Sequence, residues 1–488
     1  MTSLPRAYLV LALVMLLGAS LRLINLGEES LWLDEARGIN RAAGDLGELT
    51  AWRTQDPNPP LYYILLKPWV GLLGTSEWAA RSFSVVFGVL CIPVIFLVAR
   101  TLFDERTGLL SSFIASITIF QIQYSQEARM YSLLSFLSLV SVYAFLQLTR
   151  DGGRREVALY LVASCAMIYT HIYGLFVLIF QNAWMLSLCR DRVIWKRWIA
   201  LQVVVFLAFT PWLPGFAYQV GNPSTQSWIP CPDPGTLYQS IAAYLGGREW
   251  RMVLFVSLAV LGVFSFRKLS GRLELGKPLG SLSTYSWNVK LADTRSLLTL
   301  LLWTGALFAL PVAISLLVTP IFVTRYAIVA SFPLYILVAR SARFLPGRNW
   351  SLAIALAILV ASAPSMISYY REDQKEQWRE VSLLIGKNAA EGEPVFINPP
   401  SWIEPFLYYF EEEKNTAYPL SENEGEVSWV DRTVVTPDTI GPIIEEVDGF
   451  WTVVAYSGRG YPKEHLDFIA SPQLVGVFTE LYVFHYEK

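Results

Sequence analysis

Apolar runs of membrane-spanning length recur through the first three quarters of this 488-residue chain. A helix needs about 20 mostly apolar residues to cross a bilayer core about 30 Å thick. Eleven stretches between residues 5 and 369 are candidates, of which 107–123 and 173–189 are short. A further or re-entrant helix around 60–74 would raise the number. The sequence therefore predicts a polytopic α-helical membrane protein with about 11 (11–13) transmembrane helices.

Composition supports a membrane protein and excludes several other classes. Hydrophobic residues make up 54% of the chain, charged residues only 16%, and the mean hydropathy is +0.41. A soluble protein of this length would need more polar surface. The sequence has no basic patch interleaved with aromatic residues, so nothing in it indicates a nucleic-acid partner. The four cysteines form neither a disulfide framework nor a metal-ligand spacing.

Basic residues gather in alternate loops, which the positive-inside rule assigns to the cytoplasm. The N-terminus is then cytoplasmic in a multi-pass protein of the cell membrane. The loops 26–78, 124–127, 217–250 and 319–324 face outward, together with everything after about residue 370. The basic residues are Arg106, Arg150, Arg154, Arg155, Arg190, Arg192, Lys196, Arg197, Arg267, Lys268, Arg272, Lys277, Lys290, Arg295, Arg343 and Arg348.

The C-terminal segment has a different composition. From Tyr369 onward it holds 22 acidic against 9 basic residues, a difference of −13. Short β-type runs at 393–397, 429–435, 450–456 and 474–486 accompany a helical stretch at 377–390. We therefore expect a transmembrane domain at 1–369 and a small acidic α/β domain at 370–488 on the outer face. No motif in 370–488 identifies a chemistry.

An acidic pair, Asp34 and Glu35, lies in the first outward loop, shortly after the first span. Adjacent carboxylates are costly to place near lipid, which favours a membrane enzyme with a carboxylate base over a passive anchor. A solvated loop or a helix N-terminal cap is the alternative interpretation.

Three more groups of polar residues lie on the same side. The turn Tyr124–Tyr131 contains Glu127 and Arg129, which could hydrogen-bond a sugar and a phosphate or simply pair at the interface. His171 lies at the outward end of a helix, between Tyr169 and Tyr173. It is a candidate cavity residue, or it could simply bond a backbone carbonyl. Arg325 could anchor a lipid phosphate or snorkel to the interface. The spans themselves carry few charges, which argues against an ion-coupled transporter.

Taken together, these motifs resemble the GT-C glycosyltransferases that use polyprenyl-phosphate sugars, and most of all glycosyltransferase family 39. Its relatives include the protein O-mannosyltransferases and the lipid A aminoarabinose transferases. The resemblance covers residues 1–220 well, 290–370 loosely and the C-terminal segment hardly at all. The motifs that carry it are Trp32-Leu33-Asp34-Glu35-Ala36, Asn58-Pro59-Pro60-Leu61-Tyr62-Tyr63, Ser76-Glu77-Trp78-Ala79-Ala80-Arg81 and Tyr124–Tyr131.

The resemblance implies a direct displacement at the anomeric carbon of a lipid-linked sugar. Asp34 would be the general base that removes the acceptor proton. Glu35 would orient the acceptor or Asp34, or help bind a divalent cation if one is used. On chemistry and placement, Arg129 and Arg325 would stabilise the leaving phosphate. His171, Tyr63, Asn58 and Glu127 would complete the donor-binding cavity.

One position departs from the family pattern. Aminoarabinose transferases carry a lysine just before Pro-Pro-Leu-Tyr-Tyr, where this chain has Asn58. Phosphate binding would then depend more on arginines. The expected partners are a polyprenyl-phosphate-sugar donor, a protein, lipid or glycan acceptor, and the lipid bilayer. A flippase or transporter of lipid-linked glycans and a non-catalytic membrane scaffold are the alternative functions.

Overall fold

The computed structural model describes residues 4–45, 58–150, 152–221, 228–246, 250–268, 287–291, 293–343, 350–412, 414–421, 432–455, 466–467 and 471–487. The chain divides into two compact units. The first comprises Met1–Ile24, Asp45–Leu65 and Arg81–Ser368. The second comprises Asn25–Gly44, Leu66–Ala80 and Tyr369–Lys488. Two stretches of the first loop thus belong to the same unit as the C-terminal segment.

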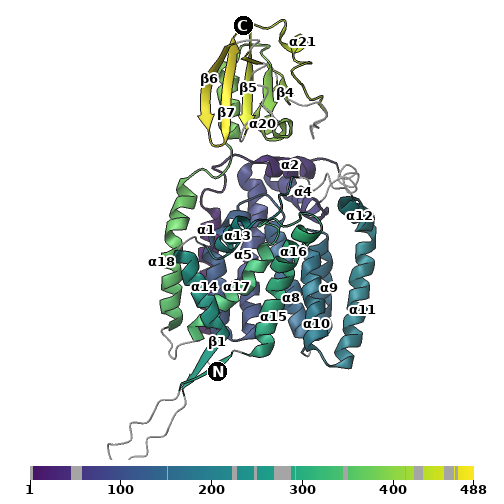
Figure 1. Ribbon diagram of the computed structural model, residues 1–488, viewed down its shortest axis with the longest axis vertical. Helices are drawn as coiled ribbons and strands as arrows, with labels where there is room; N and C mark the ends of the chain where they lie inside the picture. Colours follow the sequence, from purple (N-terminus) through teal and green to yellow (C-terminus); the bar gives the residue numbers. More distant parts are fainter. Residues whose placement is uncertain are drawn as a thin grey trace, which may run out of the picture. The chain divides into compact units, whose positions relative to one another are not determined.

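The first unit is built mainly of helices, which run side by side in Figure 1. Strands β1 (Phe264–Lys268) and β2 (Trp287–Leu291) form an antiparallel pair in this unit. Its helices are α1 (Leu4–Leu23), α5 (Glu77–Leu102), α6 (Glu105–Ile117), α7 (Ile119–Ser125), α8 (Tyr131–Leu148), α9 (Arg154–Ile168), α10 (Gly174–Leu188), α11 (Arg192–Phe209), α12 (Leu213–Gly221), α13 (Pro234–Tyr244), α14 (Trp250–Val263), α15 (Thr294–Thr304), α16 (Leu310–Leu317), α17 (Ser331–Arg340) and α18 (Trp350–Arg371).

Six helical stretches in the described part of the chain are long and apolar enough to cross a membrane. Three shorter apolar helices accompany them, including α4 (Leu61–Leu73), in the region where a further helix was expected. The predicted number of about eleven spans stays a prediction. The six stretches are Arg6–Leu23, Glu77–Leu102, Tyr131–Leu148, Arg192–Gly221, Thr294–Leu317 and Trp350–Arg371.

The short span expected at 107–123 is two helices, because the chain breaks between α6 and α7 at Thr118. The backbone of Thr118 is extended, with φ −71° and ψ 123°. Its hydroxyl donates a hydrogen bond to the Ile114 carbonyl oxygen at 2.7 Å. A hydroxyl that bonds back to the preceding turn competes with the helical ladder. The break makes α7 a separate short helix that leads directly into the turn 126–130.

A buried arginine ties α1 to this broken pair of helices. Arg22 is 1% exposed. Its Nε donates to Ser125 Oγ at 3.1 Å, and its Nη2 donates to the Ala115 carbonyl oxygen at 3.0 Å. Gln126 Nε2 in turn donates to the Arg22 carbonyl oxygen at 3.1 Å. These bonds compensate the burial of the charge and fix the start of the turn 126–130.

Neutral polar side chains join α8, α9, α10 and α11 inside the first unit. Tyr160 donates its hydroxyl to Gln181 Oε1 at 3.0 Å, and Gln181 Nε2 donates to Ser141 Oγ at 2.9 Å. Gln202 Nε2 donates to the Tyr160 hydroxyl at 2.8 Å, and Ser141 and Ser164 share a hydrogen bond of 2.9 Å. Interhelical hydrogen bonds of this kind hold helices together where lipid supplies no hydrophobic driving force.

The second unit contains a five-stranded sheet of order β4-β3-β5-β7-β6. Strand β3 pairs in parallel with β4 and β5, and β7 pairs antiparallel with β5 and β6. Side chains alternate between two apolar clusters: Val395 packs with helices α19 and α20, and Phe396 packs with Phe450 and Tyr486. The elements are α2 (Leu33–Ala43), α19 (Trp378–Asn388), β3 (Val395–Asn398), α20 (Ile403–Tyr409), β4 (Ala417–Pro419), α21 (Gly441–Ile444), β5 (Gly449–Ala455), β6 (Ser471–Phe478) and β7 (Leu481–Glu487).

Candidate functional site

The turn between α7 and α8 buries two of the expected donor-binding residues in the first unit. Glu127 is 4% and Arg129 5% exposed. The hydroxyl of Ser84 on α5 donates to the Arg129 carbonyl oxygen at 3.1 Å. Together with the bonds of Gln126, this contact fixes the backbone on which both side chains are mounted.

A second turn, between α9 and α10, carries His171, which is 2% exposed. The Tyr173 backbone N–H donates to His171 Nδ1 at 3.2 Å. Since Nδ1 accepts a hydrogen bond, the proton of the neutral ring lies on Nε2. Burial and the positive charges of Arg129 and Arg325 lower the pKa of His171 to about 3. The ring is therefore neutral and can donate from Nε2.

Arg325 lies in the segment before α17 and contacts the same group of aromatic residues. Its Nε donates to the Tyr131 hydroxyl at 3.0 Å. Its guanidinium carbon lies 5.6 Å from the ring centres of both Trp228 and Tyr326. The Tyr326 ring meets the His171 ring edge to face at 4.7 Å. The structure thus brings Arg129, Arg325 and His171 together within the first unit.

The Asn58–Tyr63 motif is attached to the turn of His171. The Leu61 backbone N–H donates to the Tyr169 carbonyl oxygen at 3.0 Å. Tyr63 is 2% exposed and packs against Tyr62 with ring centres 5.6 Å apart. Asn58 is half-buried. These two expected residues therefore lie on a segment held directly beside the His171 turn.

Asp34 and Glu35 belong to the second unit, where they occupy the first turn of α2. Carboxylates are favourable there because of the helix dipole. Asp34 is half-buried, whereas Glu35 is fully buried and paired with Lys375, Oε2 to Nζ, at 3.1 Å. Among the described residues, no group of three or more His, Cys, Asp and Glu side chains is placed to hold a metal ion.

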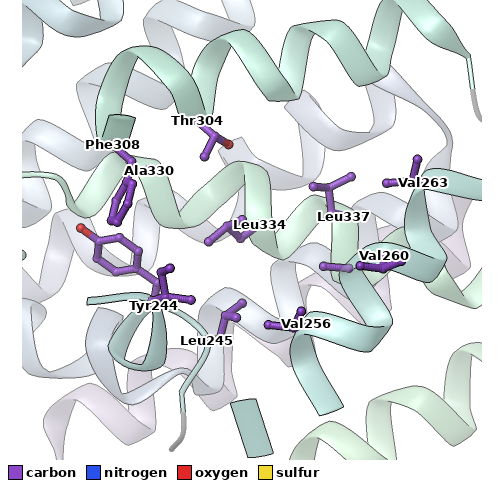
Figure 2. Close-up of a pocket in the computed structure, with 12 residues that line it drawn as sticks. Tyr244, Leu245, Val256, Val260, Val263, Thr304, Phe308, Ala330, Leu334 and Leu337 are labelled. Atoms are coloured by element: carbon purple, nitrogen blue, oxygen red, sulfur yellow. The ribbon is translucent and has the colours of Figure 1, made fainter. Parts of the chain in front are cut away.

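An apolar cavity of about 280 Å³ lies in the first unit between α13, α14 and α17. Figure 2 shows side chains of α14 and α17 around it, with the Tyr244 hydroxyl at the end away from Val263. That hydroxyl donates to the carbonyl oxygen of Thr324 at 2.9 Å. Because Arg325 follows Thr324, one end of the apolar cavity adjoins the segment that carries a guanidinium.

Sequence reasoning missed several residues that shape these sites. Tyr131 belongs to the Tyr124–Tyr131 motif, but nothing in the sequence indicates its contact with Arg325, and nothing indicates the contact of Trp228. Lys375, the partner of Glu35, is 340 positions away in the chain, and no local pattern connects the two. Arg22 could have been noticed as a charge in the last turn of an apolar run.

The comparisons with known proteins agree with this architecture. Residues 57–214 match the family model described as dolichyl-phosphate-mannose-protein mannosyltransferase. No curated protein matches the sequence significantly. The matched segment is about a third of the chain and includes the Asn58–Tyr63 motif and both buried turns.

Two groups of solved structures are similar over nearly the whole chain. ArnT from Cupriavidus metallidurans in the apo state is 13% identical, with 99% of this chain and 98% of that chain covered and a TM-score of 0.66. The same protein bound to undecaprenyl phosphate gives a TM-score of 0.62 at the same identity and coverage. The oligosaccharyltransferase AglB from Archaeoglobus fulgidus, in complex with an inhibitory peptide and a dolichol-phosphate, is 12% identical, with 98% and 74% covered and a TM-score of 0.51.

At these identities the likeness shows the fold. The chain has the fold of GT-C glycosyltransferases, and the resemblance seen in the sequence is confirmed. This fold and the six apolar helical stretches indicate a membrane protein.

Proposed function

We propose that the protein transfers a sugar from a polyprenyl-phosphate-linked donor to an acceptor hydroxyl or other acceptor group at the extracytoplasmic face of the membrane. The observation that carries the proposal is the cluster of Arg129, Arg325 and His171 in the first unit, two cations beside a buried neutral imidazole. The neighbours ArnT and AglB are bound to undecaprenyl phosphate and dolichol-phosphate, which are molecules of the proposed donor-carrier class.

The cluster suits a lipid phosphate. Guanidinium groups offer planar forks of N–H donors to phosphate oxygens, and His171 adds a neutral donor at Nε2. The apolar cavity beside Thr324 has the character needed for part of an isoprenoid chain. In the transition state the leaving phosphate gains negative charge, and fixed cations stabilise that charge without reorganising. Tyr63, Asn58 and Glu127 would line the space around the donor.

In the proposed reaction the acceptor oxygen attacks the anomeric carbon while the bond from that carbon to the phosphate oxygen breaks. The bonding electrons leave with the phosphate, and Asp34 takes the acceptor proton. Asp34 receives this role from the family resemblance, and its half-buried position on a helix suits a fixed base. Since Glu35 is paired with Lys375, we assign Glu35 to positioning α2 rather than to a metal ion.

The topology and the partners are part of the same proposal. The N-terminus would be cytoplasmic, residues 1–369 would form the membrane domain, and residues 370–488 would form an extracytoplasmic domain. The acceptor would be a protein, a lipid or a glycan. An ion-coupled flippase is less well supported, because the polar groups buried in α8–α11 bond to one another.

The test compares wild-type protein with Asp34→Asn and Arg325→Met on a panel of synthetic polyprenyl-phosphate sugars. We expect wild type to release sugar and Asp34→Asn to be slower by about 10²–10⁴-fold, the usual contribution of a general base. Binding of undecaprenyl phosphate should persist in Asp34→Asn and weaken in Arg325→Met. Asp373→Asn, which alters an exposed carboxylate of the second unit, is the matched control. Wild type that neither binds the carrier nor consumes any donor would reject the proposal in favour of a scaffold.

A further inference from the structure

The helix that carries Asp34 is bound to the C-terminal segment by two ion pairs within the second unit. Glu35 Oε2 lies 3.1 Å from Lys375 Nζ, and their side chains are 0% and 10% exposed. Arg37 Nη2 lies 2.9 Å from Glu404 Oε1, and these side chains are 16% and 8% exposed. Both partners of α2 therefore come from residues after 369.

The chain that enters α2 is held by the same C-terminal elements. The Leu31 backbone N–H donates to the hydroxyl of Tyr409 on α20 at 2.8 Å. Ser30 Oγ donates to Glu380 Oε2 on α19 at 2.9 Å. These contacts fix the helix start on α19 and α20, directly before Asp34.

The other end of α2 is fixed by a lysine of α4. Lys67 Nζ donates to the carbonyl oxygens of Ala42 and Ala43 at 3.4 Å and also to that of Gly44. A cation at this end satisfies carbonyls that have no partner inside the helix and complements the helix dipole. The helix is thus held at both ends and along one side.

Because both ion pairs are largely buried, replacing one partner of either pair should disturb the position of α2. Salt screens buried pairs much less than exposed ones. Removing one member leaves the other as an uncompensated buried charge, which the protein relieves by moving the helix or admitting water. Asp34 precedes Glu35 in the same helical turn, so any such movement changes the place of the Asp34 carboxylate.

We propose that Lys375 and Glu404 are positioning residues that set the Asp34 carboxylate through α2. The C-terminal segment then contributes to catalysis by holding this helix, without contact to the substrate. The inference rests on the proposed function, in which Asp34 is the base. A general base must lie within hydrogen-bond reach of its proton, and a 1 Å displacement can lower the rate by about 10²-fold.

The first experiment measures kcat and KM for a polyprenyl-phosphate sugar with the full-length protein. Lys375→Met and Glu35→Gln should each lower kcat by about 10- to 100-fold while KM for the donor changes less than about threefold. The double variant Glu35→Lys with Lys375→Glu should recover at least about tenfold of the loss, because it restores a pair of opposite charges. Lys387→Met, at an exposed position of α19, is the control. Unchanged kcat in Lys375→Met, or no recovery in a folded double variant, would overturn the inference.

The second experiment reads the position of residue 34 without any turnover, so it separates this inference from the proposed function. Asp34→Cys is labelled with a maleimide, and the rate is followed by mass spectrometry on the peptide that contains position 34. Adding Glu404→Gln should change the labelling rate by at least about threefold, since the Arg37 pair is lost. Equal rates with and without Glu404→Gln would reject the positioning role even in an active enzyme. A changed labelling rate, together with wild-type protein that neither binds the carrier nor consumes any donor, would reject the proposed function alone.

Discussion

The guanidinium Nε of Arg325 donates a hydrogen bond of 3.0 Å to the hydroxyl of Tyr131, a residue 194 positions earlier in the chain. This bond joins the first residue of α8 to the segment before α17 and fixes the plane of the guanidinium. The orientation of a planar fork decides which phosphate oxygens it can reach. The affinity of the first unit for a lipid phosphate should therefore depend on Tyr131.

Tyr131→Phe removes the acceptor of this bond and keeps the aromatic ring. We expect undecaprenyl phosphate to bind about tenfold more weakly, since a hydrogen bond to a charged group contributes roughly 1.5–3 kcal/mol. The measurement is a carrier titration with purified protein. Tyr160→Phe is the control, because its hydroxyl bonds to Gln181 and Gln202 instead. Equal affinity in Tyr131→Phe and wild type would contradict the role of this bond.

The residues of this cluster that could be predicted from the sequence are its three polar members. Arg129, His171 and Arg325 each stand out as polar residues at helix ends in an apolar chain. The aromatic contacts could not be predicted, because Tyr131, Tyr326 and Trp228 come from distant segments and resemble any interfacial aromatic residue. Spacing along the chain carries no information about which of many tyrosines meets which arginine.

Gly262 on α14 allows the backbone of α17 to approach closely. A Cβ at Gly262 would overlap the Leu337 carbonyl oxygen, which belongs to the backbone and cannot rotate away. Gly262→Ala should therefore separate α14 from α17 and lower the unfolding free energy by about 1–3 kcal/mol or more. The midpoint of thermal unfolding in detergent is the measurement.

Gly305→Ala is the matched control for that substitution, because a Cβ there would meet nothing within 4 Å. It should leave the unfolding midpoint unchanged or raise it slightly, since alanine favours helical backbone over glycine by about 1 kcal/mol. Equal losses in the two variants would show that the close approach of α14 to α17 does not limit stability.

Gln181→Leu should destabilise the first unit by about 1–2 kcal/mol, because it leaves the hydroxyls of Tyr160 and Ser141 without this partner. The unfolding midpoint should fall while carrier binding stays unchanged. Gln147→Leu, whose amide donates to Thr101 Oγ1 at 3.4 Å, should have a smaller effect. A larger loss in Gln147→Leu than in Gln181→Leu would contradict the importance of the α8–α11 contacts.

Glu376 in the second unit makes stability depend on pH. Burial raises the pKa of Glu376 to about 7, with Glu480 and Glu35 adding to the shift and Lys375 opposing it. Above the ordinary glutamate pKa of 4.5, the folded state then holds a proton that the unfolded state has lost. The resulting stability is present below that value and is lost as the pH rises through about 7.

Glu376→Gln should remove this dependence. The unfolding midpoint of the variant should exceed that of wild type by a margin that widens as the pH rises from about 5 to about 8. Glu372→Gln, at an exposed position nearby, should show no such trend. A margin that stays constant over this range would mean that Glu376 has an ordinary pKa.

In the second unit, the sequence predicted the type of each element better than it predicted which segments belong to the unit. The stretches 377–390, 393–397 and 450–456 coincide with α19, β3 and β5, because alternating apolar residues and turn signals are local. The run 474–486 is a hairpin of two strands, turned at Thr479 and Glu480. Residues 429–431 of the run 429–435 lie outside the described residues, and Val435 forms an isolated parallel bridge with Leu420 rather than a strand. That α2 packs with the C-terminal segment in this unit depends on ion pairs across more than 300 positions, and no local pattern encodes them.

The hydrogen bonds among α8–α11 also constrain how the protein is made. Tyr160 leaves the ribosome before Gln181 and Gln202, the two residues that hydrogen-bond its hydroxyl. A helix that enters the lipid alone would expose such a group to hydrocarbon at a cost of several kcal/mol. We therefore expect α9, α10 and α11 to leave the insertion machinery as a group. Insertion of these three helices into the membrane and their packing against one another would then occur in the same step.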